Sequence, residues 1–270
     1  MRSNLDIAIL MTRPTILWLR QDLRLSDHAA LAAAVAEGPV VPVYILDDAA
    51  PGRDAMGGAQ RWWLHHSLHA LAASLDGKGA SLVLRKGDSL VQLRQLMKQT
   101  GAQQIHATRQ YEPWWQHLDT ELGDILKLHD GNQLAPPSTI RTGSGGRYKI
   151  FTPYWRALLD RMPPSRPLPV PEHIESIAVD SDDLNDWRLI PTHPNWAGGF
   201  DVWTPGEQGA KAAFRSFLDR VGDYDRARNM PSENGTSRLS PHLHFGEISP
   251  ATIWHHVAKK VGSQIGRAHV

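Results

Sequence analysis

The stretch Thr15-Ile-Leu-Trp-Leu-Arg-Gln-Asp-Leu-Arg-Leu-Ser-Asp27 decides the fold of the N-terminal half of this chain. Its first six residues, 15–20, form a short apolar run that is typical of a strand buried inside a sheet. Ser26 and Asp27 are residue types that cap helices, and an alanine-rich run at 29–36 follows them and stops at Gly38-Pro39. The stretch therefore predicts a strand, a loop and a helix in direct succession.

The same alternation continues to residue 135. Apolar runs at 40–46, 81–85, 104–108 and 125–129 predict four further strands. Helices are predicted between them at 59–75, at 89–100 after an Asp88 cap and before Gly101, and at 114–122. Five strands separated by helices indicate an α/β domain with a doubly wound parallel five-stranded sheet, Rossmann-like in plan. We place this domain at residues 14–135.

Composition narrows the class of protein. The 270 residues carry 29 Lys+Arg against 28 Asp+Glu, a net charge of +1, which excludes a strongly basic nucleic-acid coat but allows a local basic patch. Cysteine is absent, so disulfides, thiolate catalysis and cysteine-bound metals are excluded. No apolar run approaches the ~18 residues of a membrane-spanning helix, and the N-terminus is a poor signal peptide. We therefore expect a cytoplasmic protein without membrane contact.

The loop after the first strand contains no glycine. A dinucleotide site on this kind of sheet needs glycines at that point, because the backbone must approach the pyrophosphate closely. An ordinary NAD site in the N-terminal half is therefore excluded by the pattern.

Residues 136–203 change character and are rich in proline, which excludes long regular elements. Only 151–161 could form a helix of useful length there, so we expect a long connector that lies across a larger body. Helical patterns return at 207–221 and, after Ser249-Pro250, at 251–261. Residues 204–264 are therefore predicted to begin a second, all-α domain.

The run Gly235-Thr-Ser-Arg-Leu-Ser-Pro241 has the residue types of an anion cradle. Gly235 allows a tight turn, three hydroxyl groups and several backbone amides follow it, and Arg238 adds one cation. Amides at such a turn bind phosphate groups through their N–H dipoles. A plain Ser/Thr helix cap explains the same residues equally well, so both interpretations stay open on chemistry alone.

Tyr224, Arg226 and Arg228 stand shortly before this run. An aromatic ring beside arginines could stack on a base and neutralise a phosphate. Residue chemistry alone favours the other interpretation, a solvated helix end whose arginines pair with Asp223 and Asp225.

Taken together, the motifs resemble the DNA photolyase/cryptochrome family. The run Thr236-Ser-Arg-Leu-Ser-Pro-His-Leu-His-Phe-Gly-Glu-Ile-Ser249 is similar to the flavin-binding signature of that family, and 17–27 is similar to its first strand and loop. Arg109-Gln-Tyr-Glu-Pro113, Gly146-Arg-Tyr-Lys-Ile-Phe-Thr-Pro-Tyr-Trp155 and Trp203-Thr-Pro-Gly-Glu207 match in the same order. The resemblance covers residues 15 to about 262.

The resemblance implies an N-terminal α/β antenna domain, a connector and a helical domain that holds FAD. It assigns a flavin contact to Tyr224 and DNA binding to Arg228. It assigns the loop that holds the FAD phosphates to Thr236, Ser237, Arg238, Leu239 and Ser240. No catalytic side chain and no metal is implied, because the cofactor supplies the chemistry.

The implied activity is light-dependent repair of cyclobutane pyrimidine dimers by electron transfer from reduced FAD, with UV-damaged DNA as the partner and a monomer as the expected state. The alternative is a cryptochrome, which uses the same flavin fold as a blue-light receptor without repair. Family members continue well beyond the flavin signature, and 265–270 reads as a non-native tail. We therefore expect a truncated chain, inactive alone, that binds FAD weakly or not at all and leaves Ile253, Trp254 and Val257 partly exposed.

Several aromatic residues keep two interpretations. Trp114 and Trp115 follow a site where some family members contact a pterin, so they could stack on an antenna chromophore, a folate or a deazaflavin, or pack inward; packing is favoured. Trp62 and Trp63 carry the same ambiguity. His66 and His69 could share a metal, but no carboxylate accompanies them, and solvated histidines are favoured. His242 and His244 either approach the flavin or support the loop.

Overall fold

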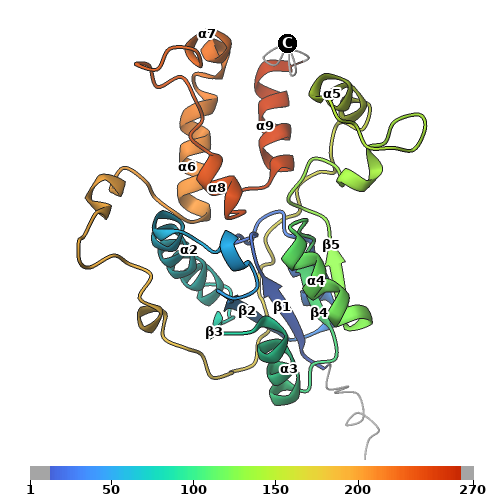
Figure 1. The fold of residues 1–270 in the computed structure, drawn as a ribbon, viewed down its shortest axis with the longest axis vertical. Coiled ribbons are helices and arrows are strands. Elements are labelled where there is room, and N and C mark those ends of the chain that lie inside the picture. The colour runs from blue at the N-terminus through green and yellow to red at the C-terminus, as the bar shows by residue number, and fades with distance from the viewer. Residues whose placement is uncertain (1–12, 263–270) are drawn as a thin grey trace, which may run out of the picture.

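The computed structural model describes residues 13–262. Five parallel strands form one sheet in the order β3-β2-β1-β4-β5 (Figure 1). The strands are β1 (Thr15–Leu19), β2 (Val40–Leu46), β3 (Val83–Lys86), β4 (Ile105–Thr108) and β5 (Leu126–His129). The predicted doubly wound α/β sheet is confirmed. The chain adds β2 and β3 on one side of β1 and then returns to add β4 and β5 on the other side.

Helices cover both faces of this sheet. Leu17 and Leu19 of β1 point into a core that contains residues of α1 (Ala29–Glu37) and α2 (Gly58–Asp76). Ile16 and Trp18 point to the opposite face, where the core contains residues of α3 (Ser89–Thr100) and α4 (Pro113–Leu122). Because side chains alternate between the faces of a strand, one continuous apolar run fills both cores.

The start of α1 differs from the prediction. His28 is its N-cap, and the His28 Nδ1 accepts a hydrogen bond from the Leu31 N–H at 3.2 Å. The prediction of Ser26 and Asp27 as caps is wrong, because distant segments engage both side chains. The Ser26 hydroxyl bonds to Glu207, and the Asp27 carboxylate accepts the Ser249 hydroxyl. By contrast, α3 begins after Asp88 and ends at a left-handed Gly101, as predicted.

The connector crosses the α/β domain, as expected. Its one α-helix within the described residues is α5 (Phe151–Leu159). A short 3-10 helix, η3 (Pro137–Thr139), precedes α5, and two more follow it, η4 (Leu184–Trp187) and η5 (Ala197–Phe200). The Val40 N–H donates to the Glu175 carbonyl at 2.8 Å, and the Ile174 and Trp187 side chains are buried in the core below α1 and α2. The connector is therefore an integral layer of the N-terminal domain.

The C-terminal helices stand beyond the sheet (Figure 1). They are α6 (Glu207–Leu218), α7 (Tyr224–Ala227), α8 (Ser240–His244) and α9 (Pro250–Val261). Helix α6 ends three residues before the predicted end at 221. Ser249 caps α9 and Pro250 is its first residue, as predicted. A small apolar core joins α6 to the residues around α8, and Ile253 and Val257 of α9 lie only half-buried against it.

Candidate cofactor-binding loop and its support on the α/β domain

The loop at residues 235–240 is anchored at both ends. A Cβ placed on Gly235 would lie 2.3 Å from the Ala227 carbonyl oxygen, so only glycine allows the loop to pack directly on α7. The Leu239 side chain is 3% exposed and belongs to the helical core. The sharp turn lies at Arg238, whose φ of 52° is left-handed, rather than at Gly235. Close approach, and not turn geometry, therefore explains the glycine.

Between these anchors the polar groups face outward. Thr236, Arg238 and Ser240 are exposed, and Ser237 is half-buried. The backbone N–H groups of 236–238 donate no hydrogen bond to any residue that the structure describes. The Ser237 hydroxyl accepts only a long bond, 3.4 Å, from the Leu239 N–H. The loop therefore presents free donors and one cation, which is what an anionic ligand requires.

Tyr224 and Arg228 lie on the helix against which this loop packs. The Tyr224 ring meets Phe217 edge-on, with 5.6 Å between centroids, at the border of the helical core. The Arg228 guanidinium carbon is 5.8 Å from the centroid of the Tyr224 ring, and the residue is exposed. Arg226 instead bonds to Glu233 with both nitrogens at 3.2 Å, so its predicted pairing with Asp223 and Asp225 is wrong.

Glu247 connects α8, the helix that follows the 235–240 loop, to the α/β domain. Its carboxylate is fully buried, and its Oε1 accepts the Trp63 Nε1–H of α2 at 2.9 Å and the Gly206 N–H at the start of α6 at 2.7 Å. The other oxygen pairs with the Nδ1 of His242 in α8. One acidic side chain therefore holds three elements together. Sequence reasoning did not single it out, although an acid inside the apolar run 245–248 was a signal.

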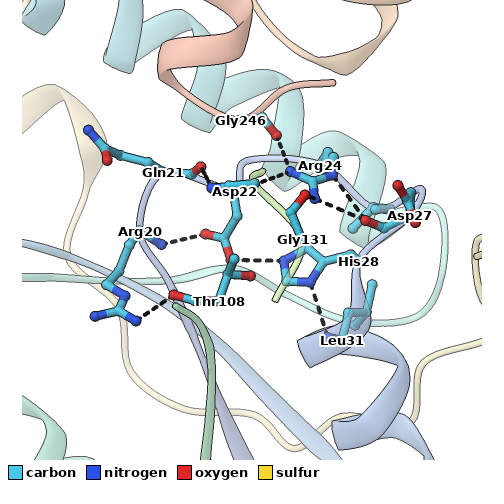
Figure 2. A network of polar contacts seen from close by, with 12 residues as sticks. Arg20, Gln21, Asp22, Arg24, Asp27, His28, Leu31, Thr108, Gly131 and Gly246 are labelled. Atoms are coloured by element: carbon cyan, nitrogen blue, oxygen red, sulfur yellow. Dashed lines mark hydrogen bonds and ion pairs between the residues drawn. The ribbon is translucent and has the colours of Figure 1, made fainter. Parts of the chain in front are cut away.

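The loop after β1 forms a second connection (Figure 2). Arg24 is 1% exposed and donates from Nη1 to the Gly246 carbonyl at 2.9 Å, while its Nη2 donates to the Asp27 and Gly131 carbonyls. Gly246 has a φ of 64°, and a Cβ there would lie 2.0 Å from the Gln21 carbonyl oxygen. The Arg24 guanidinium of this loop is therefore engaged by three backbone carbonyls, one within the loop and two from other segments.

Within the same network Asp22 and His28 form a buried pair, with 3.2 Å between Oδ2 and Nε2 (Figure 2). Burial alone would raise the pKa of Asp22. The attraction of His28, together with hydrogen bonds from His28, Thr108 and the Arg20 backbone, outweighs burial and lowers this pKa to about 2. The carboxylate therefore stays ionised inside the domain.

The comparisons with known proteins agree with this arrangement. The sequence model of the DNA photolyase family matches residues 15–172. The chain belongs to the DNA photolyase family. It is 45% identical over 258 residues to deoxyribodipyrimidine photo-lyase of Agrobacterium fabrum, covering 91% of this chain and 53% of that protein. It is 32% identical over 255 residues to cryptochrome-2 of Arabidopsis thaliana, covering 88% and 42%.

Among solved structures, a bacterial class III photolyase from Agrobacterium tumefaciens superposes with a TM-score of 0.87 and 44% identity, over 94% of this chain and 54% of that one. The chain spans about half the length of the curated photolyases it matches. Proteins of the photolyase/cryptochrome family bind FAD, in keeping with the donors on the 235–240 loop.

The ambiguous tryptophans of this photolyase-family chain pack inward. Trp63 is 5% exposed and contacts the rings of Trp203, His242 and Phe245. Trp62 is likewise buried. Trp115 meets Trp18 edge-on at 5.7 Å, and the Arg20 guanidinium carbon lies 5.2 Å from the centroid of its ring. Trp114 and Trp115 are both half-buried, and of the two Trp115 packs against the core. Packing is therefore the observed role of Trp62, Trp63 and Trp115.

The histidines also separate into roles. His242 is buried and holds α8 in place through its contact with Glu247. His244 is exposed, and its Nε2 lies 3.2 Å from the Gln60 amide nitrogen. His66 tilts over the Trp62 ring at 4.4 Å. Between residues 13 and 262 no cluster of His, Asp and Glu has the geometry of a metal site. In that same range no helix is long and apolar enough to cross a bilayer. The tail predicted at 265–270 lies outside the described residues.

Proposed function

We propose that the 235–240 loop binds the diphosphate of FAD and that the chain forms the N-terminal half of a light-dependent DNA photolyase. The row of unengaged N–H groups at 236–238, next to two hydroxyls and the Arg238 guanidinium, carries this proposal. Free donors of this kind, grouped beside a guanidinium, bind phosphate oxygens. An ordinary Ser/Thr helix cap would accept an N–H of α8, but the N-cap of α8 is Leu239 and no side chain caps this helix.

Each proposed contact has a distinct role. Thr236, Ser237 and Ser240 would donate hydroxyl hydrogens to phosphate oxygens, and Arg238 would supply charge. The Leu239 side chain is committed to the core, so this residue would act through its backbone. Tyr224 would contact the flavin beside the loop. The Arg238 guanidinium carbon lies 6.0 Å from the centroid of the Trp203 ring, which limits the directions the side chain can take.

The substrate we propose is DNA that contains a cyclobutane pyrimidine dimer. Reduced FAD, when bound and excited by light, supplies the electron that splits the cyclobutane ring. This chain's part is to hold the cofactor and to position the duplex. Exposed Arg228 would contact a DNA phosphate, which orients the duplex without reading its sequence.

A cryptochrome-type blue-light receptor is the second candidate, because the chain is 32% identical to cryptochrome-2 of Arabidopsis thaliana. The two candidates differ in outcome and not in the proposed cofactor site. Illuminating the chain, supplemented with the C-terminal half of the Agrobacterium fabrum relative, with a dimer-containing oligonucleotide separates them. Loss of the dimer supports the photolyase, and flavin photoreduction without repair supports the receptor.

The loop assignment is tested by titrating the isotope-labelled chain with FAD to about 1 mM, a concentration that detects even weak binding. We expect the amide signals of residues 236–238 to shift. Arg238→Ala should weaken binding about tenfold, because it removes a charged hydrogen-bond donor. Arg215→Ala, an exposed arginine on α6, is the matched control. Unshifted amides, or equal affinity in the Arg238 variant, would refute the loop assignment.

A further inference from the structure

A cavity of about 430 Å³ is lined by α2 and the connector, and no residue of the proposed FAD loop lines it. One wall is α2, and the opposite wall is the connector turn at residues 185–192. This volume lies within the range of small-molecule sites in proteins. The lining residues are His65, Asn185, Arg188, Leu189, Ile190 and Thr192.

The lining combines one cation with neutral polar groups and an apolar floor. None of the six residues is acidic, and the Arg188 side chain makes no ion pair or hydrogen bond with any other residue in the described range. Leu189 is 4% exposed and joins the core, with Ile190 packed beside it. Asn185 and Thr192 add an amide and a hydroxyl at the rim.

His65 contributes a buried polar atom without a partner. Its Nδ1 is inaccessible to solvent and bonds to no group in the described part of the chain. Burial, followed by the neighbouring His66 and His69, lowers the pKa of His65, so the imidazole is neutral near pH 7.

The backbone of Arg188 is left-handed, with φ 52° and ψ 44°. A side chain other than glycine is disfavoured in that region, so glycine would be the more stable choice at this position. Strain that a fold retains at a cavity wall points to a use for the side chain that causes it. Here that side chain is the cavity's single cation.

We propose that this cavity binds a small organic anion. Its carboxylate or phosphate would pair with Arg188, and a flat or apolar body would lie on Leu189 and Ile190. The neutral His65 imidazole would lie beside that body, and its solvent-inaccessible Nδ1 would make no bond to it. Inorganic anions lack the body, and neutral rings lack the charge, so neither uses the whole cavity. This site is independent of the proposed FAD loop.

The test is calorimetric titration of the whole chain with adenosine 5′-monophosphate and with 4-hydroxybenzoate, which represent the phosphate and carboxylate forms. Adenosine and inorganic phosphate are the controls that lack one half of the ligand. Arg188→Gly is the test variant, and Arg215→Ala, at an exposed arginine outside both proposed sites, is its control.

We expect at least one of the two anions to bind more tightly than either control compound, and Arg188→Gly to weaken that binding at least about tenfold. The same variant should melt about 2–4 °C higher, because glycine relieves the left-handed strain. A residue with only a structural role would not combine higher stability with lost binding. Arg215→Ala should keep the affinity.

Three results would overturn the proposal. The first is no binding of either anion at about 1 mM. The second is equal binding of inorganic phosphate. The third is binding that Arg238→Gly abolishes and Arg188→Gly does not; that result would place the anion on the 235–240 loop and would support the FAD assignment. Failure of FAD to bind that loop leaves the cavity proposal intact.

Discussion

Replacing Glu247 with glutamine should weaken the contacts between the α/β domain and α8 and lower the stability of the fold. Two donors, the Trp63 Nε1–H and the Gly206 N–H, share Oε1, so the amide oxygen of the glutamine must occupy that position. The amide NH2 then faces the His242 Nδ1, and that ring must carry its proton on Nε2 to accept. The variant keeps its shape and loses the charge.

The expected loss follows from the bonds involved. Hydrogen bonds to a charged acceptor contribute about 1.5–3 kcal/mol each, and neutral bonds about 0.5–1.5 kcal/mol. Because Glu247 is fully buried and two backbone or indole donors remain paired, we expect Glu247→Gln to lower the free energy of unfolding by about 2–3 kcal/mol.

Urea unfolding followed by tryptophan fluorescence measures this loss. Glu175→Gln, on an exposed connector residue, is the matched control and should change stability by less than about 0.5 kcal/mol. A double-mutant cycle with Trp63→Phe should give a coupling of about 1 kcal/mol, because both variants weaken the same bond. A Glu247→Gln protein as stable as the control would refute the reasoning.

Three further predictions use the same unfolding measurement. Gly246→Ala should lower the free energy of unfolding by more than about 3 kcal/mol, because the new Cβ would overlap the Gln21 backbone. Gly101→Ala is the control: Gly101 is also left-handed but has open space around it, so the loss should be about 1 kcal/mol. Equal losses would contradict the packing argument. Asp22 has a pKa of about 2 in the folded protein, below its ordinary 3.8, so its ionised carboxylate stabilises the fold by about 2 kcal/mol above pH 4. This contribution is lost as the pH falls toward 2, and Asp22→Asn should make the free energy of unfolding less dependent on pH in that range. Burial, followed by the nearby His106, lowers the pKa of His129 below 6.5, so the unfolded chain binds a proton at this residue more tightly than the folded chain. The free energy of unfolding should therefore decrease as the pH drops below about 6.5. His129→Gln should remove this decrease, and an unchanged pH profile would contradict the prediction.

The sheet could be predicted from the sequence because each strand is decided locally. A buried parallel strand needs a short apolar run, and all five runs, from 15–20 to 125–129, lie within two residues of an observed strand. The helix stop at Gly101 is equally local. The cap at Ser26 and Asp27 could not be predicted, because their true partners, Glu207 and Ser249, lie about two hundred residues away in the chain.

In the candidate site, too, the residue types could be predicted from the local sequence and the long-range contacts could not. The residue types of the 235–240 loop predict an anion cradle, because hydroxyls, amides and an arginine suit phosphate wherever they occur together. The groups that hold the loop in place carried no such signal. Gly235 was interpreted as a turn residue, but its role is contact with Ala227, which depends on how α7 packs. Trp63 and Glu247 are 184 residues apart, and only the fold brings them together.

These long-range contacts converge on one short loop. Residues 25 and 26 donate their N–H groups to Glu207 at the start of α6, Arg24 holds the Gly246 carbonyl before α9, and Asp27 accepts the hydroxyl of the α9 cap, Ser249. Helices α6 and α9 therefore both begin on the loop that follows β1. Because a helix has a fixed direction once its first turn is fixed, the α/β domain determines how far apart these two helices stand. The 235–240 loop lies between these two helices in the chain, so a change in the β1 loop should alter FAD binding without a direct contact to the proposed cofactor loop.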